Sequence, residues 1–188
     1  IGVIVHMGKN VKKLGLTEDQ AIQNYVDGIK KVLAESDPKS TLIFETGAGN
    51  KIGSEICTPI VELAALYHRF TKKERQRIKF CIDTCHVYSA GYDLSDDEAV
   101  DSFISLLDIL LGWDNIIVIH LNNSEEPLNC HKDRHADLEH GCIEIDGLKR
   151  FTQYCYKKRV PVCAETPLKL CKKEREVVLL KEGLEGIP

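Results

Sequence analysis

Five short apolar runs, each ending at a residue that can bind a metal ion, constrain this sequence more than any other feature. Each run is short enough for a buried strand, and an apolar pattern with helical spacing follows it. A succession of strand–helix units predicts an α/β fold built on a parallel sheet. The predicted strands cover 1–6, 41–44, 79–82, 115–119 and 160–164, and the residues that end them are His6, Glu45, Asp83, His120 and Glu165.

Recognisable start signals place the helices that follow the strands. A capping box starts the first helix at Thr17, and Ser95 with Glu98 starts the third. Thr58 is the predicted cap of the second helix, with Pro59 at its first position. The predicted helices cover about 17–36, 59–70, 96–110, 147–158 and 172–180, and a long polar loop spans 121–142.

Two α/β architectures arrange parallel strands in this way. A doubly wound nucleotide-binding sheet needs G-x-G-x-x-G after a strand, and Gly47-Ala48-Gly49 lacks the third glycine at that spacing. A TIM (β/α)8 barrel instead gathers its chemistry at the carboxyl ends of many strands around one rim. Because all five predicted strands end at a residue that can bind a metal ion, the sequence favours a TIM barrel of which five β/α units are present.

Length and composition agree with one globular domain. The chain has 188 residues, 43% hydrophobic and 29% charged, which suits a single domain over 1–188. No apolar run approaches the roughly 20 residues that span a bilayer, and no signal peptide opens the chain. We therefore expect an intracellular protein, cytoplasmic or nuclear, that is not secreted. Because Ile1 already lies in a strand, we also expect the chain to be the later part of a longer protein.

The cysteines form no recognisable disulfide or metal motif. No C-x-x-C pair is present, and several cysteines lie inside apolar strands. We interpret most of them as buried free thiols. The eight are Cys57, Cys81, Cys85, Cys130, Cys142, Cys155, Cys163 and Cys171.

Three further metal-binding residues accompany those at the strand ends. His86 follows Asp83 by three residues, in the predicted turn after the strand. Asp133 and His135 are two apart, which directs both side chains the same way in extended backbone. The eight candidates are four His, two Asp and two Glu. One ion takes about four to six donors, so eight donors imply at least two ions, and donors without thiolate favour zinc or manganese.

Each candidate also has an ordinary structural interpretation. A histidine at a strand end is often a hydrogen-bonded structural group, and a carboxylate there often caps the next helix. Asp133-Arg134-His135 alone reads equally well as a surface ion-pair cluster. His68, His131 and His140 keep their structural interpretation. The eight candidates taken together predict a metal site.

Several segments resemble the signature sequences of the endonuclease IV family of apurinic/apyrimidinic (AP) endonucleases. The resemblance runs in order along nearly the whole chain. Members of that family are eight-stranded barrels that hold three zinc ions, so the resemblance implies that the fourth to eighth strands are present and that an N-terminal part is lacking. The segments are Glu45-Thr46-Gly47-Ala48-Gly49, Cys81-Ile82-Asp83-Thr84-Cys85-His86, Ala90-Gly91-Tyr92-Asp93-Leu94, His120-Leu121-Asn122 and Asp133-Arg134-His135.

The resemblance implies how the ligands divide among three zinc ions, with manganese as the alternative metal. Glu45 bridges the first two ions. The family's remaining ligand, a histidine that ends the preceding strand, has no counterpart here. The first ion is held by His6 and Glu45, the second by Glu45, Asp83, His120 and Glu165, and the third by His86, Asp133 and His135.

Three positions depart from the family's pattern. Asn123 replaces an aspartate, Asn129-Cys130 replaces a Gly-Ser pair, and Glu139-His140 replaces a Gly-Glu pair. These departures affect the geometry of the loop rather than the implied ligands.

The resemblance also implies an activity in DNA base excision repair. Family members hydrolyse the phosphodiester 5′ to an abasic site in double-stranded DNA, leaving a 3′-hydroxyl and a 5′-deoxyribose phosphate. Zinc activates water and stabilises the leaving oxygen, so no serine or cysteine nucleophile is required. The predicted catalytic residues are Glu165, which would also orient the attacking water, and Glu45.

Basic residues that follow the strands are the predicted DNA contacts, because they would ring the metal-binding end of the barrel. The net charge of −4 gives no support to nucleic-acid binding by the chain as a whole. We expect a monomer that binds no membrane. The predicted contacts are Lys9, Lys12, Lys13 and Arg134.

Two other functions remain open at this level. One is a sugar isomerase or epimerase on the same barrel, which needs only one or two divalent ions. His86 and the Asp133-Arg134-His135 loop argue against it, because an isomerase requires fewer ligands. The other is an inactive metal-binding fragment whose open sheet exposes apolar edges and tends to aggregate.

Overall fold

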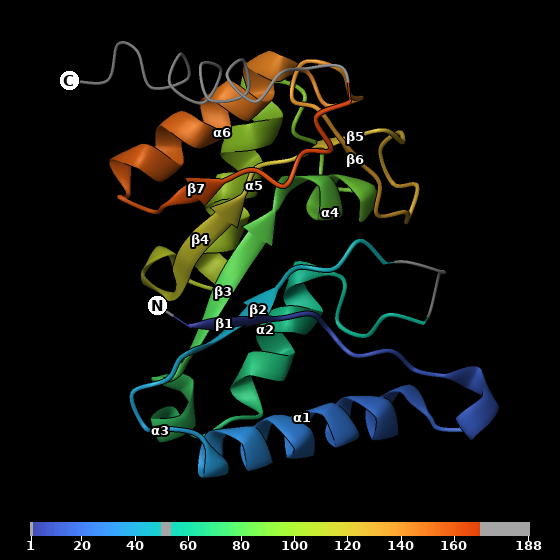
Figure 1. Cartoon of the computed structure of the whole chain (residues 1–188), viewed down its shortest axis with the longest axis vertical. Coiled ribbons are helices and arrows are strands. Elements are labelled where there is room, and N and C mark those ends of the chain that lie inside the picture. The colour runs from blue at the N-terminus through green and yellow to red at the C-terminus, as the bar shows by residue number, and fades with distance from the viewer. Residues whose placement is uncertain (1, 50–53, 170–188) are drawn as a thin grey trace.

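Five parallel strands form one sheet, and their order across the sheet is β1-β2-β3-β4-β7 (Figure 1). The computed structural model describes residues 2–49 and 54–169, apart from the side chain of Lys12. The parallel α/β fold and all five predicted strands are confirmed. The strands are β1 (Val3–Val5), β2 (Leu42–Glu45), β3 (Ile78–Asp83), β4 (Ile116–His120) and β7 (Val162–Cys163).

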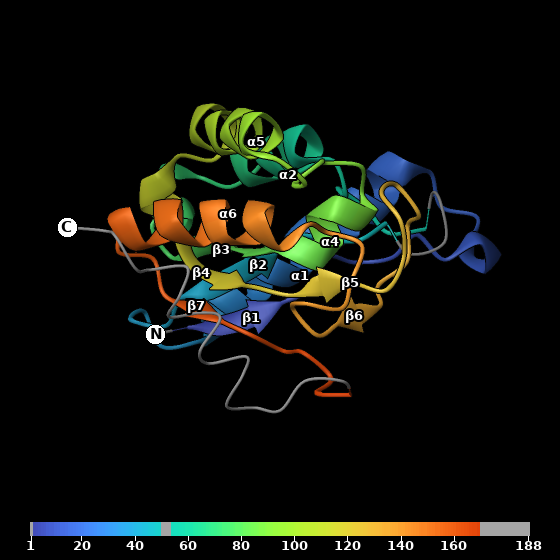
Figure 2. The ribbon, with the colours of Figure 1, turned by 90° about the horizontal axis from the view of Figure 1, so that it is seen from above.

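Helices connect the strands, and α2, α5 and α6 lie on the same side of the sheet (Figure 2). Four of the five predicted helices are confirmed, and the fifth, at 172–180, lies outside the described residues. None of the described helices is long and apolar enough to cross a membrane. The α-helices are α1 (Glu18–Glu35), α2 (Ile60–His68), α3 (Lys72–Arg75), α4 (Thr84–Ser89), α5 (Asp97–Leu110) and α6 (Ile145–Lys157), and the 3-10 turns are η1 (Lys12–Leu14) and η2 (Trp113–Asn115).

The start of α5 differs from the prediction. The cap is Asp96 rather than Ser95, because the Asp96 carboxylate accepts a hydrogen bond from the Ala99 N–H at 2.8 Å. The N–H of Ser95 donates instead to Asp93 Oδ1 at 2.9 Å. A carboxylate caps as well as a hydroxyl and adds a favourable charge at the helix N-terminus, so the aspartate is the better cap.

The start of α2 also differs. Thr58 makes no capping hydrogen bond, and Pro59 itself is the extended residue that precedes the helix. The first helical N–H, that of Ile60, donates to the Tyr92 hydroxyl at 2.9 Å. A side chain distant in sequence therefore satisfies an N–H that a local cap was expected to bind.

A short helix, α4, replaces the turn that was predicted after the third strand. Asp83 ends β3 and caps α4, since its Oδ1 accepts a hydrogen bond from the His86 N–H at 3.0 Å. His86 thus lies in the first turn of a helix that begins directly at the strand end. The capping role and the ligand role that were alternatives for Asp83 are compatible in one side chain.

Aromatic side chains fill the layer between the sheet and the helices. Phe80 on β3 is 0% exposed. Its ring centroid lies 5.1 Å from that of Tyr67 on α2 and 6.5 Å from that of Phe44 on β2. This packing fixes the middle of the sheet, from which the strand ends project.

A two-stranded hairpin, β5 (Asn123–Ser124) and β6 (His135–Ala136), forms within the predicted loop 121–142. The Asn123 amide anchors it: Nδ2 donates to the carbonyls of Leu138 and Ile143 at 2.7 and 2.9 Å. Its Oδ1 accepts from the Ile143 N–H at 2.8 Å. An aspartate has no N–H to donate, so asparagine at this position suits the loop of this chain.

The cysteines of the described residues are all free thiols, as expected. Four of them are buried, namely Cys57, Cys81, Cys85 and Cys155. Cys130 is half-buried, whereas Cys142 and Cys163 are exposed, so the interpretation as buried thiols holds for only part of the set. Cys171 lies outside the described residues.

Candidate metal centre

The carboxyl ends of three adjacent strands bring Glu45, Asp83 and His120 together. Glu45 ends β2, Asp83 ends β3 and His120 ends β4, and Asp83 is paired with His120 across the sheet. They are 2%, 0% and 6% exposed respectively. A buried ionisable group keeps its charge only beside a partner of opposite charge or a metal ion. The neighbours of these three side chains therefore determine whether they are charged.

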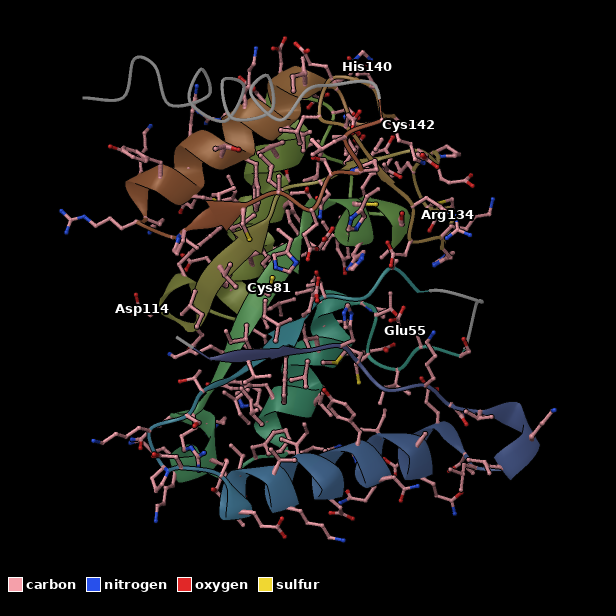
Figure 3. The ribbon with its side chains drawn as sticks, in the orientation of Figure 1. Glu55, Cys81, Asp114, Arg134, His140 and Cys142 are labelled. Atoms are coloured by element: carbon pink, nitrogen blue, oxygen red, sulfur yellow. The ribbon has the colours of Figure 1, made fainter. Side chains whose placement is uncertain are left out.

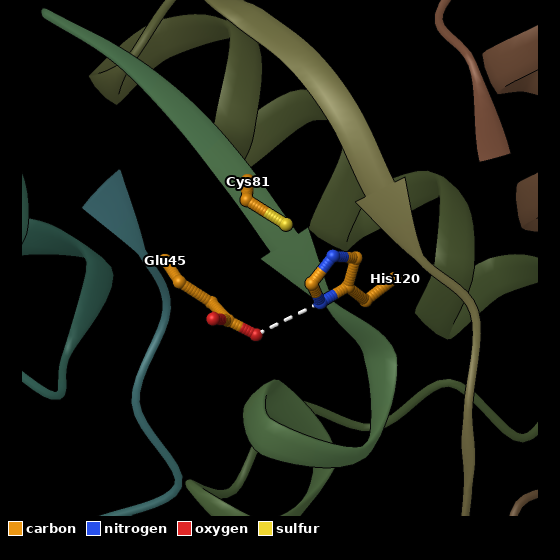
Figure 4. Close-up of side chains that lie close together, drawn as sticks. All are labelled: Glu45, Cys81 and His120. Carbon is orange, nitrogen blue, oxygen red and sulfur yellow. Dashed lines mark hydrogen bonds and ion pairs between the residues drawn. The ribbon is translucent and has the colours of Figure 1, made fainter. Parts of the chain in front are cut away.

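Glu45 contacts three histidines from three other segments of the chain. Its Oε1 lies 3.0 Å from His120 Nδ1 and 3.7 Å from His86 Nδ1. Its Oε2 lies 3.5 Å from His6 Nε2. Figure 4 shows the Glu45–His120 pair with Cys81 beside it. One carboxylate whose oxygens face different histidines has the geometry of a bridging ligand.

Asp83 connects this group to the hairpin. Its Oδ2 lies 3.9 Å from His120 Nδ1 and 3.6 Å from His135 Nε2. Asp133 Oδ1 in turn lies 3.3 Å from His135 Nε2 and 3.2 Å from His86 Nε2. Asp133 and His135 therefore point toward the same space, as their spacing predicted.

Two of the histidine nitrogens have the chemistry of metal ligands. His86 Nδ1 lies 2.8 Å from the Thr46 carbonyl, to which it donates, so Nε2 is the nitrogen that can offer a lone pair to a cation once its proton is displaced. The Nε2 atoms of His86 and His135 are buried and make no hydrogen bond. Buried nitrogen atoms without a hydrogen bond, turned toward a carboxylate, fit the coordination of a cation.

His6 and Glu165 lie on the more open side of the centre. The side chain of His6 is 69% exposed and that of Glu165 is 50% exposed. Glu165, which follows β7, places its Oε2 3.0 Å from His120 Nδ1. A carboxylate that contacts the buried group and also faces solvent can touch both a metal ion and a substrate.

The electrostatics of the centre favour positive charge. Burial favours the neutral ring of His86, but the surrounding carboxylates, chiefly Asp83 and Asp133, raise its pKa from 6.5 to about 10. Burial alone would raise the pKa of Glu45, but the hydrogen bond from His120 and the charge of His86 lower it. The carboxylates therefore stay ionised and hold a proton on the His86 ring when no cation is bound, and a divalent ion would displace that proton.

All eight candidate ligands are joined by contacts of 3.9 Å or less. Two subsets have donor atoms within 4.8 Å of one another. One is Glu45, Asp83, His120 and Glu165, and the other is His86, Asp133 and His135. Metal binding by these residues stays a prediction.

Two thiols that the sequence analysis left out also lie at the centre. The Cys81 sulfur is within 4.8 Å of donor atoms of Glu45 and His120. The Cys85 sulfur is within the same distance of donor atoms of Asp83 and His135. Each lies two residues from Asp83 in the sequence, and strand alternation places Cys81 on the same face of β3 as Asp83. Cys85 lies in α4, so alternation does not place it.

The predicted DNA contacts stay predictions. Lys9, Lys13 and Arg134 are exposed, and Arg134 lies at the edge of the molecule in Figure 3. The side chain of Lys12 lies outside the described part of the chain. The three lysines follow β1, and Arg134 lies in the loop between β5 and β6. Both segments extend from the end of the sheet at which the strands terminate.

The sequence matches a family model described as a xylose isomerase-like TIM barrel over residues 1–163. It is 43% identical to a putative endonuclease 4 of Acanthamoeba polyphaga mimivirus, over 89% of this chain and 53% of that protein. It is 39% identical to a probable endonuclease 4 of Persephonella marina, over 87% of this chain and 55% of that protein. The chain therefore spans about half the length of these curated relatives.

Solved structures agree with the sequence matches. The crystal structure of endonuclease IV from Thermus thermophilus superposes with a TM-score of 0.72 at 28% identity, over 96% of this chain and 59% of that one. The predicted TIM barrel, with five strands present, is thereby confirmed. The chain belongs to the xylose isomerase-like TIM barrel family, in its endonuclease IV branch.

Proposed function

We propose that this chain carries the catalytic metal centre of a zinc-dependent AP endonuclease that acts in DNA repair. The proposed reaction hydrolyses the phosphodiester 5′ to an abasic site in double-stranded DNA and leaves a 3′-hydroxyl and a 5′-deoxyribose phosphate. The observation that carries the proposal is the convergence of eight imidazole and carboxylate side chains from five strand ends, the helix α4 and one hairpin. The similarity to proteins named endonuclease 4 supports it.

The donor set fits zinc ions. Imidazole and carboxylate donors in two adjacent groups would suit two or three divalent ions. Glu45, which contacts both His6 and His120, would be a ligand common to two of them. When bound, such ions supply a nucleophile at neutral pH and stabilise the negative charge that develops on the phosphate and leaving oxygens. The buried position of Glu45 keeps water away from its contacts and would hold its carboxylate in one orientation toward the ions.

Glu165 is the residue best placed to act on the attacking water. Its side chain is 50% exposed, yet its Oε2 stays 3.0 Å from His120 Nδ1. It can therefore accept a hydrogen bond from a water molecule on the solvent side and aim that water's lone pair at the phosphorus atom. His120, held between Glu45 and Glu165, fixes the distance between the two carboxylates.

Incision measured before and after chelation tests this function. We expect bound zinc by elemental analysis, together with incision of a duplex that contains one abasic site. A chelator should abolish incision and zinc should restore it, because the ligands provide no other nucleophile. Incision that survives complete removal of the metal would contradict the proposal.

The two alternative functions predict different results in the same experiment. A sugar isomerase would convert a ketose from a panel of sugars and leave the abasic duplex intact. An inactive fragment would bind metal without either activity, and size-exclusion chromatography would show it aggregated or dimeric.

Charge reversal near η1 tests the predicted DNA contacts. Replacing Lys12 and Lys13 by glutamate should weaken binding to abasic DNA and lower the salt slope of binding by about 1 for each phosphate that the protein no longer neutralises. The matched control replaces Lys157 and Lys158, at the end of α6 and before β7, where no contact with DNA is predicted. Equal effects of the two double substitutions on affinity and salt slope would show that the predicted contacts are wrong.

A further inference from the structure

Asn122 connects two of the candidate ligands without belonging to the ligand set. It is 0% exposed and follows His120 by two residues. Its Nδ2 donates a hydrogen bond to Asp83 Oδ2 at 2.7 Å. Its Oδ1 accepts one from the backbone N–H of Glu165 at 2.8 Å. One amide group thus joins the end of β3 to the segments that follow β4 and β7.

The backbone of Asn122 is itself fixed. Its N–H donates to Thr84 Oγ1 at 2.8 Å, and its carbonyl accepts from the same hydroxyl at 2.6 Å. Thr84 is 0% exposed and is the first residue of α4, directly after Asp83. The asparagine therefore cannot move relative to Asp83 without breaking buried hydrogen bonds.

The orientation of the amide is determined by its partners. Asp83 accepts at Oδ2, and the Glu165 N–H only donates. A rotated amide would turn its oxygen toward a carboxylate and its N–H toward another N–H, and both contacts would repel. Each Asp83 oxygen accepts one hydrogen bond, from the His86 N–H at Oδ1 and from Asn122 at Oδ2, and keeps a lone pair for a cation.

We propose that Asn122 is the positioning residue of the metal centre, which sets the Asp83 carboxylate and the Glu165 backbone at a fixed separation. The proposal rests on the metal centre of the proposed function. Hydrogen-bond partners of metal ligands typically contribute about 10- to 100-fold to metal affinity. Asn122 contacts two ligand-bearing segments at once, so its effect reaches both.

The substitution Asn122→Asp tests this role. It keeps the size of the side chain and the acceptor for the Glu165 N–H, but it places a second carboxylate against Asp83. We expect zinc affinity, measured by competition with a chromophoric chelator, to fall about 10- to 100-fold. We also expect the visible absorption of the cobalt-substituted protein to change, because that absorption reports the arrangement of the ligands.

Asn123→Asp is the matched control. Asn123 is 1% exposed, and its amide makes buried hydrogen bonds to backbone groups of Leu138, Ile143 and Ser124 rather than to a candidate ligand. The same chemical change should destabilise folding in both variants. Only Asn122→Asp should alter the cobalt spectrum and the zinc affinity measured on folded protein.

Other outcomes would overturn the proposal. It is wrong if both variants bind zinc with the parent's affinity, or if both lose affinity in proportion to their loss of stability. If Asn122→Asp does not fold, Asn122→Ala is the second variant. It removes the amide without adding charge, and it should also lower the zinc affinity and change the cobalt spectrum. These zinc and cobalt measurements need no DNA, so they can be compared with the separate incision assay. A parent protein that binds zinc but does not cut abasic DNA would contradict the proposed function alone. A parent protein that binds no zinc would overturn both proposals.

Discussion

Replacing His86 by alanine is expected to remove one metal ion per chain and to lower turnover more than about 100-fold. The ring lies between Glu45 and Asp133, and its Nδ1 is held by the Thr46 carbonyl while its Nε2 is left without a hydrogen bond. Loss of a hydrogen-bond partner of a ligand costs about 10- to 100-fold, so loss of a ligand should exceed that. Elemental analysis and single-turnover incision of an abasic duplex measure the two effects.

His68→Ala is the control for this prediction. His68 is exposed on α2, where its Nδ1 lies 2.5 Å from Arg75 Nη1 and its ring packs against Tyr67. Its loss should leave both metal content and turnover unchanged. If the two alanine variants lose metal or activity equally, the assignment of His86 to the centre is wrong.

Replacing Phe80 by alanine is expected to lower the free energy of unfolding by about 3–5 kcal/mol. The ring is 0% exposed and packs between the rings of Tyr67 and Phe44 at the middle of the sheet. Removing it leaves a cavity that the flanking strands cannot close without moving. Urea unfolding of the metal-free protein measures the change as a shift of the midpoint at constant slope.

Ile109→Ala provides the comparison for Phe80. Ile109 lies on α5 and is 80% exposed, so its substitution should change the free energy of unfolding by no more than about 0.5 kcal/mol. A loss below about 1 kcal/mol for Phe80→Ala would mean that the core collapses around the cavity. That result would contradict the rigid packing on which the strand ends depend.

The strands could be predicted because each reads as a continuous apolar run with polar ends, a pattern typical of parallel strands. The central strands β2 and β3 are buried on both faces, whereas the edge strands β1 and β7 are partly exposed. The run 79–82 corresponds to β3 (Ile78–Asp83), and the run 115–119 to β4 (Ile116–His120). The convergence of Glu45, Asp83 and His120 could be predicted as well, since it needs only that adjacent parallel strands end at the same edge of the sheet; in detail, Asp83 lies opposite His120 and Glu45 opposite Cys81.

The rest depends on contacts between residues that are distant in sequence. Asn122 meets Asp83 across 39 residues and Glu165 across 43, and no local pattern distinguishes it from an ordinary loop asparagine. The β5–β6 hairpin joins two short segments across a long polar loop that lacks strand alternation. The predicted cap of α5 is wrong by one residue because Ser95 and Asp96 are both good caps, and it is the Asp96 carboxylate that accepts the hydrogen bond from the Ala99 N–H.

The order of strands in the sheet has a consequence for how this chain folds during synthesis. Each of β2, β3, β4 and β7 pairs with the sheet strand that precedes it in the chain, so every new strand–helix unit can add to an edge that already exists. The partners are about 35 to 45 residues apart, but each lies in the preceding unit, so units can be added in the order in which they are synthesised. The proposed metal centre, by contrast, can be complete only after β7 has been synthesised, because its candidate donors extend from His6 to Glu165. A nascent chain that ends before β7 would carry most of the proposed donors but lack Glu165, so, if the proposed zinc centre forms, tight zinc retention would mark chains that have folded through β7.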